Sequence, residues 1–221
     1  MSLDLPIWSL IITLALIMAV PVYHIIRGRL ARREAARLSR ALSTSHAIFA
    51  ALEHVPDNLL QRDLRRGLVL LLNAHLDILE HYNPTHPHLR AMRNRVLKLN
   101  KIPSGLKRTA LRSKQARRHA TLALEELAGM LKEGIKTELL DRHDGALAQA
   151  SAQFTAQQIA IDAARQAAKD AENVRAYPHA LNFAHQALAL CRKLPPLMGK
   201  AMTDAVSQDI ERLESLVRRA A

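Results

Sequence analysis

The chain has 221 residues, with 32 Lys or Arg against 20 Asp or Glu, which gives a formal net charge of +12. Its single cysteine, Cys191, excludes a disulfide framework and fits a reducing compartment. Only seven glycines, three Phe, three Tyr and one Trp are present. Because this composition favours helices over sheets, we predict an all-α protein.

The N-terminal region is strongly apolar. Residues 6–26 contain no Asp, Glu, Lys or Arg, and as a helix they would span the hydrocarbon core of a bilayer, which is about 30 Å thick. Trp8 and Tyr23 lie near the two ends of the run, where aromatic rings favour the headgroup region. A cleaved signal peptide would carry positive charge ahead of the run, but only Asp4 is charged there. We therefore predict a transmembrane anchor over residues 1–27.

Arginines follow the apolar run directly and set its predicted orientation: Arg27, Arg29, Arg32 and Arg33. Positively charged residues next to a span stay in the cytoplasm, so the N-terminus is expected outside and the rest of the chain inside. The sequence thus predicts a protein of the bacterial inner membrane with a cytoplasmic C-terminal domain.

Helical periodicity and turn residues divide the cytoplasmic part. Residues 28–55 read as a basic juxtamembrane helix that continues the anchor. Residues 56–145 read as a helical region, with helices from Pro56 to about Tyr82, over 88–100 and through Leu111 to Leu139, and with a joint at 141–145. Residues 146–221 read as Ala-rich helical hairpins, with helices over about 146–173, 178–193 and 197–219. The prediction is a single transmembrane helix followed by a bundle of antiparallel helical hairpins.

One short segment matches a known helical unit. Its residues are Tyr177, Ala180, Leu181, Ala184, Ala187, Leu188 and Leu190, preceded by Ala164, Ala167, Ala168 and Ala171. This segment, residues 160–191, resembles a tetratricopeptide hairpin, with the alanines in the small-residue first helix. It departs from that pattern at Ala184, where the repeat carries a large aromatic residue. Its first helix also lacks the bulky anchor residues of the repeat. The resemblance implies a pair of antiparallel helices.

Charge is concentrated in one block. Residues 81–124 contain no Asp or Glu but eleven cations: Arg90, Arg93, Arg95, Lys98, Lys101, Lys107, Arg108, Arg112, Lys114, Arg117 and Arg118. We call this segment the acid-free block. Such a density of like charge destabilises a compact fold unless an anion offsets it. The candidates are a protein partner with acidic side chains, anionic lipid headgroups and nucleic acid phosphate; the alternative is a solvent-exposed face without a ligand.

Nucleic acid is the less favoured of these partners. No Phe, Tyr or Trp lies between Tyr82 and Leu124, so the block offers no ring on which bases could stack. Helices over 88–100 and 106–119 could form a helix-turn-helix, but in the second of them Gln115 is the only amide suited to adenine. Only non-specific phosphate contact is therefore expected.

No pattern of catalytic, cofactor-binding or metal-ligating residues stands out. His75, His81, His86 and His88 cluster near one turn, but their spacing matches no familiar metal site. We predict no enzyme activity, no cofactor and no bound metal. The sequence favours a single-pass membrane protein whose cytoplasmic domain is a protein-binding or scaffolding module, with anionic lipid as a second contact. The alternative is a membrane-tethered, non-specific nucleic-acid-binding protein; the pattern does not fix an oligomeric state.

Overall fold

The protein is all-α over the residues that the structure describes. The computed structural model describes the backbone of residues 4–103, 111, 113–194 and 196–220, and the side chains in these ranges except those of 4–22, 25, 196–198 and 220. The helices are α1 (Asp4–Leu52), the short 3-10 helix η1 (Asp57–Leu59), α2 (Arg62–Tyr82), α3 (Leu89–Asn100), α4 (Lys114–Lys136), α5 (Arg142–Asn173), α6 (Tyr177–Cys191) and α7 (Pro196–Ala220). No strand occurs within these ranges, which confirms the predicted fold class.

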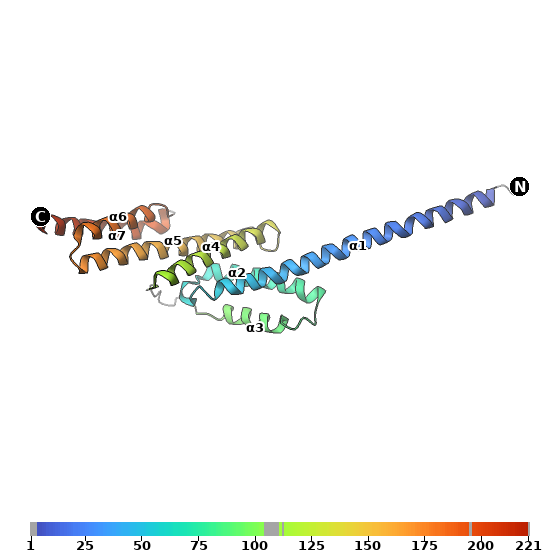
Figure 1. Ribbon diagram of the computed structural model, residues 1–221, viewed down its shortest axis with the longest axis horizontal. Helices are drawn as coiled ribbons and strands as arrows, with labels where there is room; N and C mark the ends of the chain where they lie inside the picture. Colours follow the sequence, from blue (N-terminus) through green and yellow to red (C-terminus); the bar gives the residue numbers. More distant parts are fainter. Residues whose placement is uncertain (1–3, 104–110, 112, 195, 221) are drawn as a thin grey trace.

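The first helix is a rod that joins the bundle only at its C-terminal end (Figure 1). It has 49 residues, and at 1.5 Å per residue it is about 74 Å long. The described side chains from Tyr23 to Arg37 are all exposed, whereas Ala41, Ile48 and Phe49 are buried. The N-terminal half of α1 therefore projects from the body, and the C-terminal end packs on α2 and α4.

Two hydrophobic clusters lie along the molecule. The first joins the end of α1 with α2, α3, α4 and the first half of α5, and its centre consists of the fully buried leucines of α2 and α4. The second joins the end of α5 with α6 and α7 around Ile161, Ala184 and Leu213. Because α5 contributes to both clusters, one continuous helix connects the two parts of the bundle. α6 and α7 lie at the opposite end of the molecule from the N-terminus (Figure 1).

The helix ends differ from the sequence prediction at two places. Pro56 does not open α2; the one-turn η1 intervenes, and α2 begins at Arg62. The predicted joint at 141–145 is also wrong, because α5 already begins at Arg142. The Asp141 side chain accepts hydrogen bonds from the backbone N–H groups of His143 and Asp144, which caps the helix there.

The hairpin predicted at 160–191 is formed by the end of α5 and by α6, which pack on each other. The turn between them includes Arg175 at φ 58°. The tetratricopeptide relationship itself stays a prediction, as does the division of the chain into four regions.

Within the part of the chain whose side chains are described, no helix has both the length and the apolar character needed to cross a membrane. The predicted anchor, residues 1–27, lies mostly outside that part.

Candidate functional site

The acid-free block is divided between two helices. Arg90, Arg93, Arg95 and Lys98 lie on α3, and Lys101 caps its C-terminus. Lys114, Arg117 and Arg118 lie in the first turns of α4. Lys107, Arg108 and Arg112 lie outside the described residues. The four arginines expected to set the topology, Arg27, Arg29, Arg32 and Arg33, are exposed on the projecting half of α1 and are not part of this surface.

Three cations of the block are used inside the fold. A guanidinium nitrogen of Arg93 lies 2.5 Å from a carboxylate oxygen of Asp77 and 2.8 Å from one of Glu80. Arg95 lies 3.0 Å from Glu53 and 4.4 Å above the ring of Phe49. Glu53, Asp77 and Glu80 precede the block in the sequence. The packing of α1 and α2 on α3 brings them next to its arginines. Internal anions therefore offset part of the charge.

Arg117 is the third of these cations, since its guanidinium donates to the backbone oxygen of Leu111 at 2.9 Å. Five other cations form no ion pair with a side chain that the structure describes, and all five are exposed: Arg90, Lys98, Lys101, Lys114 and Arg118. The surface available to an external anion is thus smaller than the sequence suggested.

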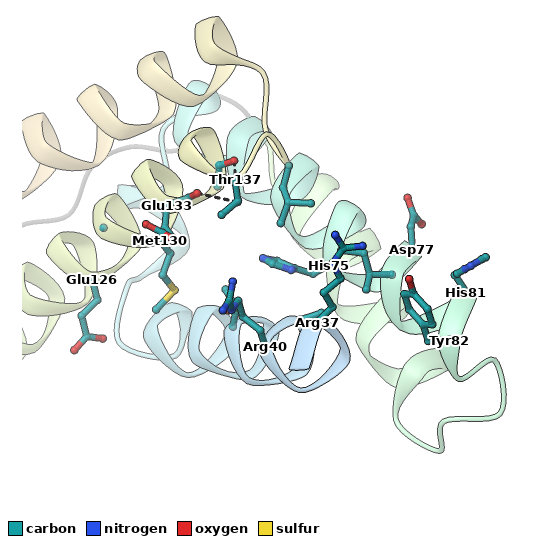
Figure 2. Close-up of a pocket in the computed structure, with 16 residues that line it drawn as sticks. Arg37, Arg40, His75, Asp77, His81, Tyr82, Glu126, Met130, Glu133 and Thr137 are labelled. Atoms are coloured by element: carbon teal, nitrogen blue, oxygen red, sulfur yellow. Dashed lines mark hydrogen bonds between the residues drawn. The ribbon is translucent and has the colours of Figure 1, made fainter. Parts of the chain in front are cut away.

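A groove that the sequence did not reveal opens between α1, α2 and α4 (Figure 2). Its volume is about 1020 Å³, which is large for a protein of this size, and it is open to solvent along one side. The three helices contribute residues spaced three or four apart, as expected when one face of each helix lines a shared cavity. The lining residues are Arg37, Arg40, Ala41, Thr44, His75, Asp77, Ile78, His81, Tyr82, Glu126, Gly129, Met130, Glu133, Gly134, Thr137 and Leu139.

The charges on the two sides of the groove are opposite. Arg37 and Arg40 extend from α1, and neither forms an ion pair with a described side chain. Glu126 and Glu133 extend from α4 on the other side. Glu133 is 3.7 Å from Lys136, while Glu126 has no such partner among the described side chains. The groove therefore has a positive wall and a negative wall, and its apolar lining includes Ala41 on α1, Ile78 on α2 and Met130 on α4.

Gly129 lies on the α4 side of this groove, and no other part of the chain that the structure describes packs against it. A Cβ atom built on Gly129 meets no atom within 4 Å. The buried glycines Gly67, Gly134 and Gly145 differ, because a Cβ there would lie 2.3 to 2.7 Å from a packed side chain. A mid-helix glycine costs roughly 1 kcal/mol relative to alanine. Close packing explains that cost at these three positions, but no described contact explains it at Gly129.

His75 is the buried polar group of the groove. Its side chain is only 5% exposed, and its ring points into the cavity from α2 (Figure 2). The Nδ1 atom has no hydrogen-bond partner. Burial lowers the pKa of His75 below its usual 6.5, so the imidazole is neutral at pH 7. Nδ1 is closed to solvent, so a ligand group in the groove can reach the ring only at Nε2, which forms no hydrogen bond with a described residue.

The sequence contained only part of this information. The leucine spacing of α2 places His75 on the apolar face of that helix, and the spacing of the neighbouring histidines matches no familiar metal site, so neither pattern indicates a groove. Within the described residues, no group of three or more His, Cys, Asp or Glu side chains is placed to hold a metal ion. Nothing in the sequence indicates that Arg37, Arg40 and Glu126 share a site, because no local pattern brings α1 and α4 together.

Comparison with protein-family models, with curated proteins and with solved structures found no match to this chain.

Proposed function

We propose that the chain is a single-pass protein of the bacterial inner membrane whose cytoplasmic bundle binds a partner protein in the groove between α1, α2 and α4. The apolar run over residues 6–26 and the arginines after it support the anchor and its orientation. The protein acts by recruitment and has no catalytic role. Its anchor holds the groove close to the membrane, which raises the effective concentration for partners bound to the same membrane.

The groove fits an amphipathic α-helix better than a compact ligand. It is bounded by three helices, open to solvent and partly lined by apolar side chains from each helix, which is the arrangement of helix-in-groove recognition. The opposite charges of its walls match a helix with acidic residues along one edge and basic residues along the other. A small anionic ligand would meet Glu126 and Glu133 as well as the arginines.

Gly129 is the observation that carries the proposal. A partner backbone can approach a helix most closely where no Cβ intervenes, and Gly129 offers such a place among the groove-lining residues of α4. A glycine at this position lowers the stability of α4, and no described contact within this chain explains why it is there. We expect the partner helix to cross α4 at this residue with a small side chain facing it.

A peptide selection tests the proposal directly. The probe is a displayed library of 20-residue helical peptides with Leu, Ile, Met or Ala on one face and all residues allowed on the two edges. The target is the full-length chain in lipid nanodiscs. We expect enrichment of groove-binding peptides with a small residue in the apolar face, and we expect the Gly129→Trp variant to lose at least tenfold in affinity for them.

Gly28→Trp is the matched control, because a Cβ at Gly28 also meets nothing within 4 Å but lies on the projecting half of α1. This variant is expected to bind the peptides like the unmodified chain. Circular dichroism checks that both variants keep their helices. Peptides that bind Gly129→Trp and the unmodified chain equally well, or a selection that enriches none, would contradict the proposal.

Anionic lipid is a weaker partner for the acid-free block than its charge suggests. Arg95 pairs with Glu53, and the rings of His54 and His119 lie 5.4 Å apart, so this surface lies beside the C-terminal end of α1. That end is about 39 Å along the helix from residue 26 at 1.5 Å per residue. With α1 near the membrane normal, this separation far exceeds the screening length of about 8 Å at physiological salt.

Non-specific nucleic acid binding remains the second candidate, supported by the five exposed cations that form no ion pair with a described side chain. The test compares the unmodified chain with a variant in which Lys98, Lys101, Lys114 and Arg118 are changed to Gln. Duplex DNA binding is measured between 50 and 200 mM salt. This candidate predicts an affinity that falls steeply with salt and a shallower slope for the variant. A chain that binds no DNA at 50 mM salt excludes it.

A further inference from the structure

We infer that the partner helix inserts one carboxylate side chain among Arg37, Arg40 and His75, and that docking is coupled to proton uptake at His75. This inference rests on the proposed function and names the recognition chemistry of the groove. It commits the partner to an Asp or Glu that faces α1 and α2, in addition to an apolar face.

The first support is the position of the imidazole. His75 is nine-tenths buried, its ring points into the groove, and its Nδ1 atom is unpaired. Nδ1 itself is closed to solvent, so a ligand atom in the groove reaches the ring at Nε2, which forms no hydrogen bond with a described residue.

The second support is the charge beside it. Arg37 and Arg40 point into the same groove from α1 and form no ion pair with the described side chains. A carboxylate is the side-chain group that accepts from both guanidinium and imidazole N–H groups, and guanidinium–carboxylate pairs are among the stronger hydrogen bonds in proteins. A neutral hydroxyl would satisfy His75 but would leave the two arginines unpaired.

The acidic side chains that line the groove do not form an ion pair with His75. Asp77 lies on α2 but pairs with Arg93, and Glu133 on α4 is 3.7 Å from Lys136. Glu126 on α4 and His81 on α2 are exposed. None of these acids therefore pairs with Arg37 or Arg40. The two arginines can join His75 in holding an anion from the partner. We expect Glu126 to contact the basic edge of the partner instead.

Proton uptake follows from the change in surroundings. In the empty groove the imidazole is neutral at pH 7, because burial disfavours its charged form. A carboxylate next to the ring favours the imidazolium, so the pKa of His75 is higher in the complex than in the free protein. The complex then binds more protons, and affinity rises as the pH falls from 8 towards 6. Below about pH 5 the partner carboxylate itself takes up a proton and the gain is lost.

The experiment uses peptides enriched by the groove selection described above. Affinity is measured by titration calorimetry at pH 6.0, 7.0 and 8.0, in two buffers of different ionisation enthalpy, so that proton uptake is counted directly. We expect enriched peptides to share an Asp or Glu at one position. Changing it to Asn or Gln should weaken binding at least tenfold at pH 6.0 and remove the pH dependence.

Two protein variants complete the test. His75→Gln keeps a polar group in the groove but cannot take up a proton, so it should bind with no measurable proton uptake. His179→Gln alters an exposed histidine of α6 that does not line the groove, and it should leave the proton uptake unchanged. Circular dichroism of each variant separates loss of binding from loss of fold.

The outcomes distinguish the two proposals. A selection without groove-dependent peptides overturns both. Peptides that need the open groove at Gly129 but share no acidic residue, or that bind His75→Gln with the same proton uptake, overturn the inference and leave the proposed function standing.

Discussion

The Cβ atom that Gly67 lacks would lie 2.3 Å from the Cβ of Ala148, so α2 and α5 pack at a distance that only glycine permits. We predict that Gly67→Ala lowers the free energy of unfolding by about 1 to 3 kcal/mol, because overpacking a rigid contact costs more than the gain in helix propensity. Thermal and urea unfolding followed by circular dichroism measure the change. Retained stability would mean that α5 shifts without cost.

The same substitution at Gly129 has the opposite expected sign. An alanine Cβ there meets nothing within 4 Å, and helix propensity alone decides the outcome. We predict that Gly129→Ala raises the free energy of unfolding by up to about 1 kcal/mol. The two variants form a matched pair within one protein, measured under one set of conditions. A destabilised Gly129→Ala would show that the groove closes around this residue in solution.

Much of the fold could be predicted because it depends on local sequence. The leucine spacing of α2, the prolines at 84 and 87 and the break after Asn100 place the C-terminal end of α2 and both ends of α3 within about one residue of their observed positions, whereas the start of α2 lies at Arg62 and not at Pro56. The start of α5 was misplaced because Asp141 was read as part of a loop, although Asp is a strong N-cap residue and its side chain accepts two backbone N–H groups.

The candidate site could not be predicted because it depends on how distant segments meet. Arg93 stands in an acid-free stretch of sequence, yet its partners Asp77 and Glu80 lie on the preceding helix of the folded chain. Arg40 and Glu126 lie 86 positions apart in the chain and share one groove. Charge counted along the sequence therefore overestimated the surface open to an external anion and missed the groove.

His75 should make the stability of the protein dependent on pH. Its folded pKa is lowered by burial, while the unfolded value is about 6.5, so the unfolded chain binds more protons as the pH falls below 6.5. The free energy of unfolding then falls with pH by up to about 1.4 kcal/mol per unit until the folded pKa is reached. Above pH 7.5 this effect is absent.

We predict that His75→Leu removes this component and equals or exceeds the unmodified chain in stability, because an apolar side chain replaces a buried atom without a partner. The measurement compares the free energies of unfolding of the two proteins at pH 8.0 and pH 5.5. The gap between them should widen in favour of His75→Leu at the lower pH. An equal gap at both values would place the pH dependence elsewhere.

Arg93 and Arg90 offer a test of how the acid-free block is divided. Arg93 pairs with Asp77 and Glu80 and also donates to the side-chain oxygen of Asn73 at 3.2 Å, whereas Arg90 is exposed and has no ion pair with a described side chain. We predict that Arg93→Ala lowers the free energy of unfolding by about 1 kcal/mol, since two carboxylates one helical turn apart would lose their shared cation. Arg90→Ala should change it by less than about 0.5 kcal/mol.

The two arginine variants should reverse their order in polyanion binding. If nucleic acid or another external polyanion uses the block, Arg90→Ala should weaken binding and reduce its salt dependence, because an exposed cation without an ion pair to a described side chain is removed. Arg93→Ala should have the smaller effect, since the charge it removes is already offset by Asp77 and Glu80. Affinity is measured against salt for both variants. Equal losses of affinity would mean that Arg93 leaves its internal partners when a polyanion binds.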